Sequence, residues 1–241
     1  MPGILHRDLS PNNIMYRMIK GWNGKEETEY VYGVLTDYDL SSWAASLTGD
    51  YTKTLQQRTG TPPYMAHELL TGESDIHLYR HDVESLFYIM LLLCARHEFD
   101  LNREAKWPLV MREGKLPYED WFDEPKYAKL GMFKAFFFSQ VEAIELFPAF
   151  EDIRKWLLHL QYSFSDGFEL KYSYKKRKAR AGDSAGELPP FDDETLGGKI
   201  DYSSLIEPIP YLKGELEKLD VRYKGPSPAT STPAGAVSAD A

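Results

Sequence analysis

Cysteine is nearly absent from this chain, since Cys94 is the only one among its 241 residues. A single cysteine cannot form an internal disulfide, so a reducing compartment is expected. Cys94 lies within an apolar run, where a packed core thiol is the expected role rather than a nucleophile. The sequence therefore excludes a small domain built on a disulfide framework.

Long hydrophobic runs are also missing. The longest apolar stretch, residues 86–95, is about half the length that spans a bilayer. No basic segment leads into an apolar one at the N-terminus, as it would in a secretory signal. We therefore expect an intracellular protein, cytoplasmic or nuclear, that does not enter a membrane.

Basic charge is scarce relative to acidic charge. The chain has 28 Lys and Arg against 37 Asp and Glu, which gives a net charge of -9 and a pI near 5.2. This balance argues against binding along a phosphate backbone, so nucleic acid is not an expected partner. Because 43% of the residues are hydrophobic, the chain can bury a core of its own, and its length indicates one domain or at most two.

What is present is a short β region followed by helices. Residues 14–19 and 30–36 are rich in apolar and β-branched residues and flank a polar Asn-Gly segment, which predicts a β-hairpin. Residues 40–63 have no period and predict a loop, whereas 81–99, apolar almost all round, predict a buried central helix. Two more helices are predicted, over residues 129–147 and 150–160. The expected fold class is α+β, mainly α.

The C-terminal part of the chain has a different composition. We expect a main domain over residues 1–170, a basic and polar segment with the last helical elements over 171–224, and a disordered, low-complexity tail over 225–241. The basic cluster KKRK at 175–178 is either a nuclear import signal or part of a solvated loop, and the sequence does not choose between them.

The stretch HRDLSPNNIM places a carboxylate at Asp8 and a carboxamide at Asn13 just before the predicted hairpin. In an antiparallel pair, the residue entering the first strand lies beside the residue leaving the second, so Asn13 and Asp37 are expected to meet. Carboxylate and amide oxygens are ligands that Mg²⁺ prefers. The sequence therefore predicts a magnesium site beside Asp8, with a polar turn capped by side chains as the alternative.

Several motifs occur in an order that resembles the eukaryotic protein kinases. They are HRDL followed by Asn13, the Asp37-Tyr38-Asp39 triplet, GTPPYMAHE at 60–68, and Asp82 at the start of the buried helix. More narrowly, Ser10 after HRDL, RTGTPPYMAHELL and HDVESLFYIMLLLC resemble the fungal-type protein kinase family, over residues 3–99. The resemblance implies a kinase-like C-terminal lobe with a small β-hairpin and a buried central helix.

The resemblance also implies roles for single residues. Asp8 resembles the catalytic acid that orients the substrate hydroxyl and accepts its proton, while Asn13 and Asp37 resemble the magnesium ligands beside ATP. Thr61 resembles the threonine that hydrogen-bonds the catalytic acid, although it is otherwise a turn residue. Arg7 resembles the arginine that pairs with a phosphorylated loop residue, and an ordinary surface ion pair is the alternative.

Other matching positions support geometry or regulation. The phosphorylated residue would fall at Gln57, which cannot be phosphorylated, so the hypothesis of activation by phosphorylation depends on the nearby substitutes Thr54 and Thr59. The scaffold residues are expected to act as follows: His6 packs under the catalytic turn, Glu68 pairs with a buried arginine that the sequence does not identify, and Asp82 holds backbone amides of the turn or simply caps its helix.

Two departures from the common kinase pattern concern the site itself. Ser10 stands where common serine/threonine kinases have a lysine that steadies the transferring phosphate, and losing such a charge costs roughly 10²- to 10³-fold in rate. Asp39 replaces the glycine of the metal-binding triplet and adds a carboxylate near the metal. The fungal-type resemblance implies that both are subfamily traits.

A larger departure concerns the smaller kinase lobe. That lobe supplies a Gly-rich turn, a strand lysine and a helix glutamate, all before the HRD motif. Only residues 1–5 precede the motif here, and no G-x-G-x-x-G occurs anywhere. We therefore expect a chain without the N-terminal lobe and without the first helices of the larger lobe.

Three functional hypotheses remain open. The first is a kinase that transfers phosphate from MgATP to Ser or Thr of a protein substrate, slow or inactive without its small lobe. The second is a pseudokinase, in which the retained surface serves as a protein-binding module. The third is a truncated product of an active kinase gene. The sequence does not indicate the oligomeric state.

Overall fold

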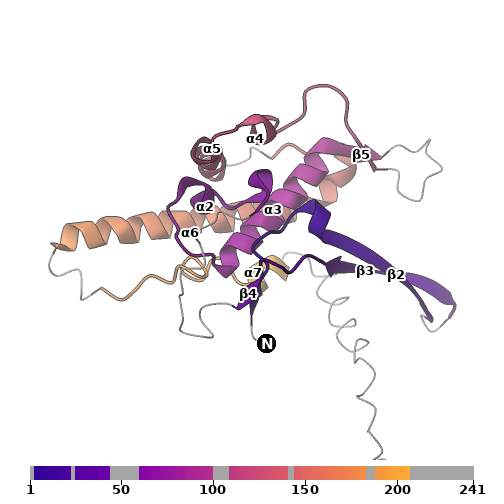
Figure 1. The fold of residues 1–241 in the computed structure, drawn as a ribbon, viewed down its shortest axis with the longest axis horizontal. Helices are drawn as coiled ribbons and strands as arrows, with labels where there is room; N and C mark the ends of the chain where they lie inside the picture. Colours follow the sequence, from indigo (N-terminus) through magenta and orange to yellow (C-terminus); the bar gives the residue numbers. More distant parts are fainter. Residues whose placement is uncertain are drawn as a thin grey trace, which may run out of the picture.

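The computed structural model describes residues 3–22, 25–43, 60–99, 109–140, 144–182 and 188–206 (Figure 1). The strands are β1 Ile4–Leu5, β2 Ile14–Trp22, β3 Glu27–Leu35, β4 Ser42–Trp43, β5 His97–Phe99 and β6 Leu109–Met111. The helices are α2 His67–Thr71, α3 Tyr79–Arg96, α4 Asp120–Asp123, α5 Tyr127–Ser139, α6 Arg154–Ala181 and α7 Tyr202–Ile206, with 3-10 turns η1 Pro11–Asn13, η2 Pro62–Tyr64 and η3 Pro148–Ile153. This content confirms the α+β class.

Helix α3 crosses the middle of the molecule and organises the core (Figure 1). Phe87, Tyr88 and Leu91 are fully buried and belong to one hydrophobic cluster with residues of α2, α5 and α6. Cys94 is buried on the same helix, and burial raises the pKa of its thiol to about 11, as expected of a packed core thiol. The prediction of a buried central helix is therefore confirmed.

The boundaries of α3 differ from the sequence prediction of 81–99. The backbone becomes extended at His97, whose backbone N–H and ring Nδ1–H both donate to the carbonyl of Leu93, the ring nitrogen at 3.1 Å. Residues His97–Phe99 then form β5, which pairs antiparallel with β6. The prediction that the helix continues to residue 99 is therefore wrong, because residues 97–99 pair as a strand with β6.

The two later helices also differ from their predicted ranges. α5 ends at Ser139 instead of reaching 147, and the N–H of Phe147 donates to the carbonyl of Cys94 on α3. In contrast, α6 is far longer than the predicted 150–160 and continues through the expected boundary at residue 170. Its buried face continues through Phe164, Gly167 and Lys171 at helical spacing.

The predicted hairpin is confirmed and extends further than expected. β2 and β3 pair antiparallel over nine positions, from Ile14 opposite Leu35 to Trp22 opposite Glu27. The ribbon extends away from the helical body (Figure 1), so many of its side chains are exposed.

The predicted loop over 40–63 is only partly correct. Ser42–Trp43 form strand β4, which pairs with Ile4–Leu5, and η2 follows from Pro62. The remainder of that loop from 44 to 59 lies outside the described residues, as does the predicted tail over 225–241. Among the helices that the structure describes, none has the length and apolar character needed to cross a membrane.

Candidate functional site

The HRD turn is anchored on the first turn of α3. Asp82 accepts the backbone N–H of His6 at Oδ2, at 2.6 Å, and that of Arg7 at Oδ1, at 3.0 Å. His77 also contacts Asp82, at 2.8 Å. Burial alone would raise the pKa of Asp82, but the hydrogen bonds from His77 and from the two backbone amides outweigh it and lower the pKa. The scaffold role expected for Asp82 is therefore confirmed geometrically.

Thr61 contacts Asp8 from the other side of the turn. The backbone N–H and the hydroxyl of Thr61 donate to Oδ1 of Asp8, at 3.2 and 3.4 Å. Gly60 makes this approach possible, because its φ of 128° is unfavourable for L side chains and a Cβ would lie 2.9 Å from Cγ of Met65. The predicted contact is thus present, while the catalytic role of both residues stays a prediction.

Asn13 joins the turn to the hairpin. Its side-chain Nδ2 donates to the backbone carbonyl of Asp8, at 2.8 Å, and its backbone carbonyl accepts the backbone N–H of Thr36, at 2.9 Å. This pairing brings the chain to Asp37, one residue further on. Asp37 has a φ of 60° and an exposed side chain. The hairpin therefore places Asn13 and Asp37 at the same end of the ribbon, as the sequence predicts.

His6 ties the turn to the segment around Asp37. Its Nε2–H donates to the carbonyl of Thr36, at 2.9 Å, and its ring centroid lies 5.0 Å from that of Tyr38. The side chain is buried, and this matches the expected position beneath the turn. His6 therefore fixes the direction in which the chain leaves β3 toward Asp37.

Arg7 and Ser10 are both buried. Burial lowers the pKa of the Arg7 guanidinium, and the nearby Asp82 carboxylate partly offsets this. The phosphorylated partner expected for Arg7, at Gln57 or the neighbouring threonines, lies outside the described residues. The role of Arg7 in phosphate pairing consequently stays a prediction.

The site fits a hard cation with few protein ligands. With Nδ2 of Asn13 engaged by Asp8, its Oδ1 has no hydrogen-bond partner among the described residues, and neither has the Asp37 carboxylate. Within the same ranges no cluster of three or more His, Cys, Asp or Glu is arranged for a metal. Two oxygen ligands suit Mg²⁺, which takes its remaining ligands from phosphates and water.

Glu68 has the buried arginine partner that the sequence analysis expected. Arg80 donates to Glu68 from Nη2, and both side chains are at most 3% exposed. Lys171 of α6 adds a second ion pair to Glu68, at 2.8 Å, and contacts Asp193, at 2.7 Å. Sequence reasoning placed Lys171 in a separate basic segment. Its spacing from the apolar residues of α6 was the available signal that it faces inward.

Lys134 was missed altogether by the sequence analysis. It is fully buried on α5, and its Nζ donates to the carbonyls of Pro62 and Met65, at 3.1 and 2.6 Å. The ammonium also lies 4.1 Å from the ring centroid of Tyr88. Burial lowers the pKa of Lys134 well below its usual value. A lysine inside the apolar run LGMFKAFFF was the signal for an interior role.

Comparison with known proteins finds similarity to protein kinases. A model of the fungal protein kinase family matches residues 1–94. The chain is 34% identical over 134 residues to the probable serine/threonine-protein kinase fhkE of Dictyostelium discoideum, covering 53% of this chain and 17% of that protein. It is 33% identical over 113 residues to the serine/threonine-protein kinase CHK1 of Saccharomyces cerevisiae, covering 47% of this chain and 18% of that one.

A third relative is the serine/threonine-protein kinase csk1 of Schizosaccharomyces pombe, 31% identical over 113 residues, which cover 46% of this chain and 32% of that protein. The chain therefore spans a third or less of each of these three relatives. No solved structure matches the chain.

Proposed function

Residues 1–94 belong to the fungal protein kinase family, and from that premise we propose that the chain forms the larger lobe of a protein serine/threonine kinase. The reaction is transfer of the γ-phosphoryl group of ATP to a Ser or Thr hydroxyl of a protein substrate. The nucleotide and the acceptor hydroxyl meet beside Asp8. The described residues supply the acceptor side and the metal side of this arrangement.

Asp8 has one oxygen available for the acceptor. Its Oδ1 takes both hydrogen bonds from Thr61, whereas Oδ2 has no partner among the described residues. Oδ2 accepts a hydrogen bond from the substrate hydroxyl and orients the hydroxyl oxygen toward the γ-phosphorus. It takes the hydroxyl proton as the new P–O bond forms and the bond between the γ-phosphorus and the β-phosphate oxygen breaks, which releases ADP. Thr61 keeps the carboxylate from rotating, so the acceptor is held in one geometry.

Asn13 and Asp37 form the metal side. Asn13 Oδ1 and the Asp37 carboxylate would hold Mg²⁺ that also binds the ATP phosphates, where it supplies positive charge against the charge of the transferring group. The hydrogen bond from Asn13 Nδ2 to the Asp8 carbonyl orients the amide so that its oxygen is free for this role.

Ser10 limits the rate that this site can reach. The residue that in common kinases places a positive charge near the transferring phosphate is here a buried serine, 2% exposed. This position therefore supplies no positive charge, and a bound Mg²⁺ would provide a larger share of the stabilisation of the negative charge on the transferring phosphoryl group. We expect turnover below that of lysine-containing kinases by roughly 10²-fold, unless the small lobe provides a substitute charge.

The observation that carries the proposal is the pair of hydrogen bonds from Thr61 to Asp8, across 53 positions of sequence. The test is a phosphorylation assay on the chain fused after a kinase small lobe, with MgATP and a mixed Ser/Thr peptide library. We expect incorporation that falls about 10²- to 10⁴-fold in Asp8→Asn. Asp166→Asn, an exposed aspartate on α6, is the matched control and keeps full activity.

A binding module without catalysis is the second candidate. The exposed apolar side chains on the β2–β3 ribbon favour it, among them Met15, Trp22 and Val31, each more than half exposed. Such a module predicts that Asp8→Asn leaves cellular function intact while no phosphorylation is detected in the fused protein. Loss of both activity and cellular function in Asp8→Asn decides for the kinase.

A further inference from the structure

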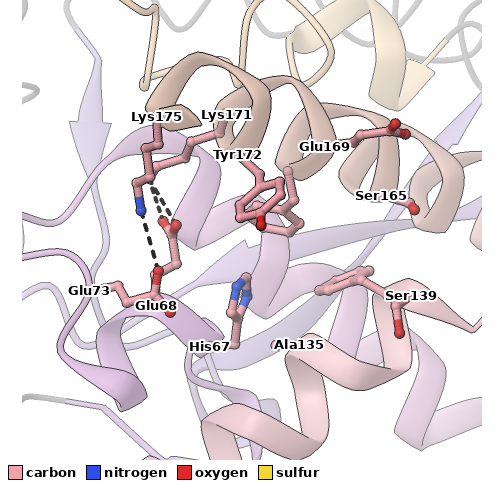
Figure 2. Close-up of a pocket in the computed structure, with 12 residues that line it drawn as sticks. His67, Glu68, Glu73, Ala135, Ser139, Ser165, Glu169, Lys171, Tyr172 and Lys175 are labelled. Carbon is pink, nitrogen blue, oxygen red and sulfur yellow. Dashed lines mark hydrogen bonds and ion pairs between the residues drawn. The ribbon is translucent and has the colours of Figure 1, made fainter. Parts of the chain in front are cut away.

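A hollow lies away from the candidate catalytic turn, between α2, α5 and α6. It has a volume of about 590 Å³, within the range of pockets that hold small organic ligands. Figure 2 shows the His67 ring pointing into it from α2 and the Tyr172 side chain above it on α6. Asp8, Asn13, Asp37 and Thr61 are not among its lining residues.

His67 presents to this pocket a ring nitrogen that has no protein partner among the described residues. Its backbone N–H and its Nδ1 both contact Oε1 of Glu84, at 2.7 and 3.0 Å. Burial would raise the pKa of Glu84, but His67 and the Tyr88 hydroxyl lower it to about 2, so the carboxylate is ionised and Nδ1 is the donor. Nε2 then has no hydrogen-bond partner among the described residues, although His67 is only 6% exposed.

The walls around that nitrogen are aromatic. The Phe168 ring meets the His67 ring edge to face, with ring centroids 4.5 Å apart. The ring centroids of Phe138 and Phe168 are 5.5 Å apart. Tyr172 completes the wall and is 61% exposed. A further ring placed against these side chains would gain packing and quadrupole interactions.

The charged residues at the opposite end are already paired. Lys171 binds Glu68 at 2.8 Å, and Lys175 binds Glu73 at 3.4 Å. Glu169 at the rim is exposed and adds negative charge. No lysine of the lining is therefore left for an anion, so the pocket disfavours a negatively charged ligand.

We propose that this pocket binds a neutral aromatic ring carrying one hydroxyl group, that is a phenol, with the ring against Phe138, Phe168 and Tyr172 and its oxygen on Nε2 of His67. A phenol suits either form of the imidazole, because it donates to neutral Nε2 and accepts from Nε2–H. The same chemistry is offered by a free phenolic molecule and by a tyrosine side chain of a partner. This inference is independent of the proposed kinase function.

The test is a ligand-observed NMR titration of the full chain with p-cresol and, in parallel, toluene, which has the same shape but no hydroxyl. We expect p-cresol to bind with a dissociation constant on the order of 1 mM or below. We expect toluene to bind about 10-fold more weakly, because it leaves Nε2 unsatisfied. Equal affinities, or no binding of p-cresol, would overturn the proposal.

Two variants locate the binding. Ala135→Phe fills the pocket from α5 and should abolish p-cresol binding, whereas Met132→Phe, at an exposed position of the same helix outside the lining, should not. Tyr172→Ala removes an exposed wall residue and should weaken binding several-fold without unfolding the chain. Undiminished binding in Ala135→Phe would place the ligand elsewhere and refute the assignment.

Two further experiments distinguish a free phenolic ligand from a partner's tyrosine, and the pocket proposal from the kinase proposal. N-acetyl-tyrosinamide tests a partner's tyrosine: affinity similar to p-cresol supports a protein ligand, and binding of p-cresol alone supports a free molecule. Asp8→Asn should leave p-cresol binding unchanged, so the failure of one proposal is distinguishable from the failure of the other.

Discussion

Arg80 and Glu68 form an ion pair in the interior, where Arg80 is fully buried and Glu68 is 2% exposed. Burial by itself would raise the pKa of Glu68. The imidazole of His81, 3.8 Å away, together with the charges of Arg80 and Lys171, reverses that effect and holds the pKa far below its usual range. The pair joins α2, which follows the GTPPYMA segment, to the start of α3, which holds the HRD turn.

Replacing Glu68 should therefore destabilise the whole fold. Glu68→Gln leaves Arg80 and Lys171 buried with Asp193 as their one remaining carboxylate partner in the described part of the chain, and we expect a loss of about 3–5 kcal/mol in the free energy of unfolding. Urea denaturation measures it. Glu73→Gln breaks the exposed pair with Lys175 and should cost less than about 1 kcal/mol. Equal effects of the two substitutions would show that the buried pair is not a structural link.

The stability should also fall on mild acidification, through His81. Burial, helped by the charges of Arg80 and His77, lowers its pKa from 6.5 to about 3, despite the opposing effects of the Glu68 and Glu84 carboxylates. Below pH 6.5 the unfolded chain binds a proton that the folded chain does not, so stability falls as pH decreases toward 3, by up to about 1.4 kcal/mol per pH unit. Glu84, with its pKa lowered to about 2, adds to the loss below pH 4.5.

Urea unfolding at about pH 7, 6 and 5 measures this dependence. The matched variant is His81→Gln, which does not titrate and retains an acceptor for the N–H of Leu78, now bound to His81 Nδ1 at 3.1 Å. We expect a shallower pH dependence in the variant than in the parent chain. Identical slopes would rule out His81 as the source.

The sequence predicted the parts of the site that depend on local geometry and on motif order. The β-hairpin fixes Asn13 next to Thr36 through its register, and Asp82 follows as the first acidic residue of a buried helix. The contact between Thr61 and Asp8 came from the family resemblance, because nothing in the spacing alone brings together residues 53 positions apart.

The parts that sequence reasoning missed depend on long-range packing. Lys134 and Lys171 occupy inward-facing positions of their helices, but a lysine by itself favours the surface, and the oxygen partners that hold each of them in the interior lie on other elements. The sequence pattern likewise predicts a helix that ends near residue 160. In the structure, Phe164 and Gly167 continue the buried face of α6, and Leu196 packs on Gly167. Their partners lie on elements far away in sequence.

Lys134 should hold the segment that carries Thr61. Lys134→Met keeps the length of the side chain but removes the ammonium donor from the carbonyls of Met65 and Pro62, of which Pro62 keeps the backbone N–H of Met65, and we expect a loss of about 1–3 kcal/mol. Hydrogen exchange should speed up at the amide of Tyr64, which bonds to Thr61. Lys129→Met, at an exposed position of the same helix, is the control. Unchanged exchange at Tyr64 in Lys134→Met would show that the segment is held by other contacts.

Thr61 should act on Asp8 through its hydroxyl. In the two-lobe fusion, Thr61→Val removes that donor and retains the backbone one, so we expect kcat to fall about 10-fold with little change in KM for ATP. Thr61→Ser retains the hydroxyl and should restore most of the rate. If Thr61→Ser is as slow as Thr61→Val, the methyl group rather than the hydrogen bond matters.

The central claim is that Asn13 and Asp37 share one divalent cation at the end of the β2–β3 ribbon. Its most direct test is a titration of the ¹⁵N-labelled chain with Mn²⁺ in the presence of ATP, followed by paramagnetic broadening in NMR spectra. We predict that the side-chain amide signal of Asn13 and the backbone signals of Thr36 and Asp37 broaden first, and that Asp37→Ala suppresses this broadening at Asn13. Broadening that spares Asn13, or that is the same in Asp37→Ala, would contradict the account.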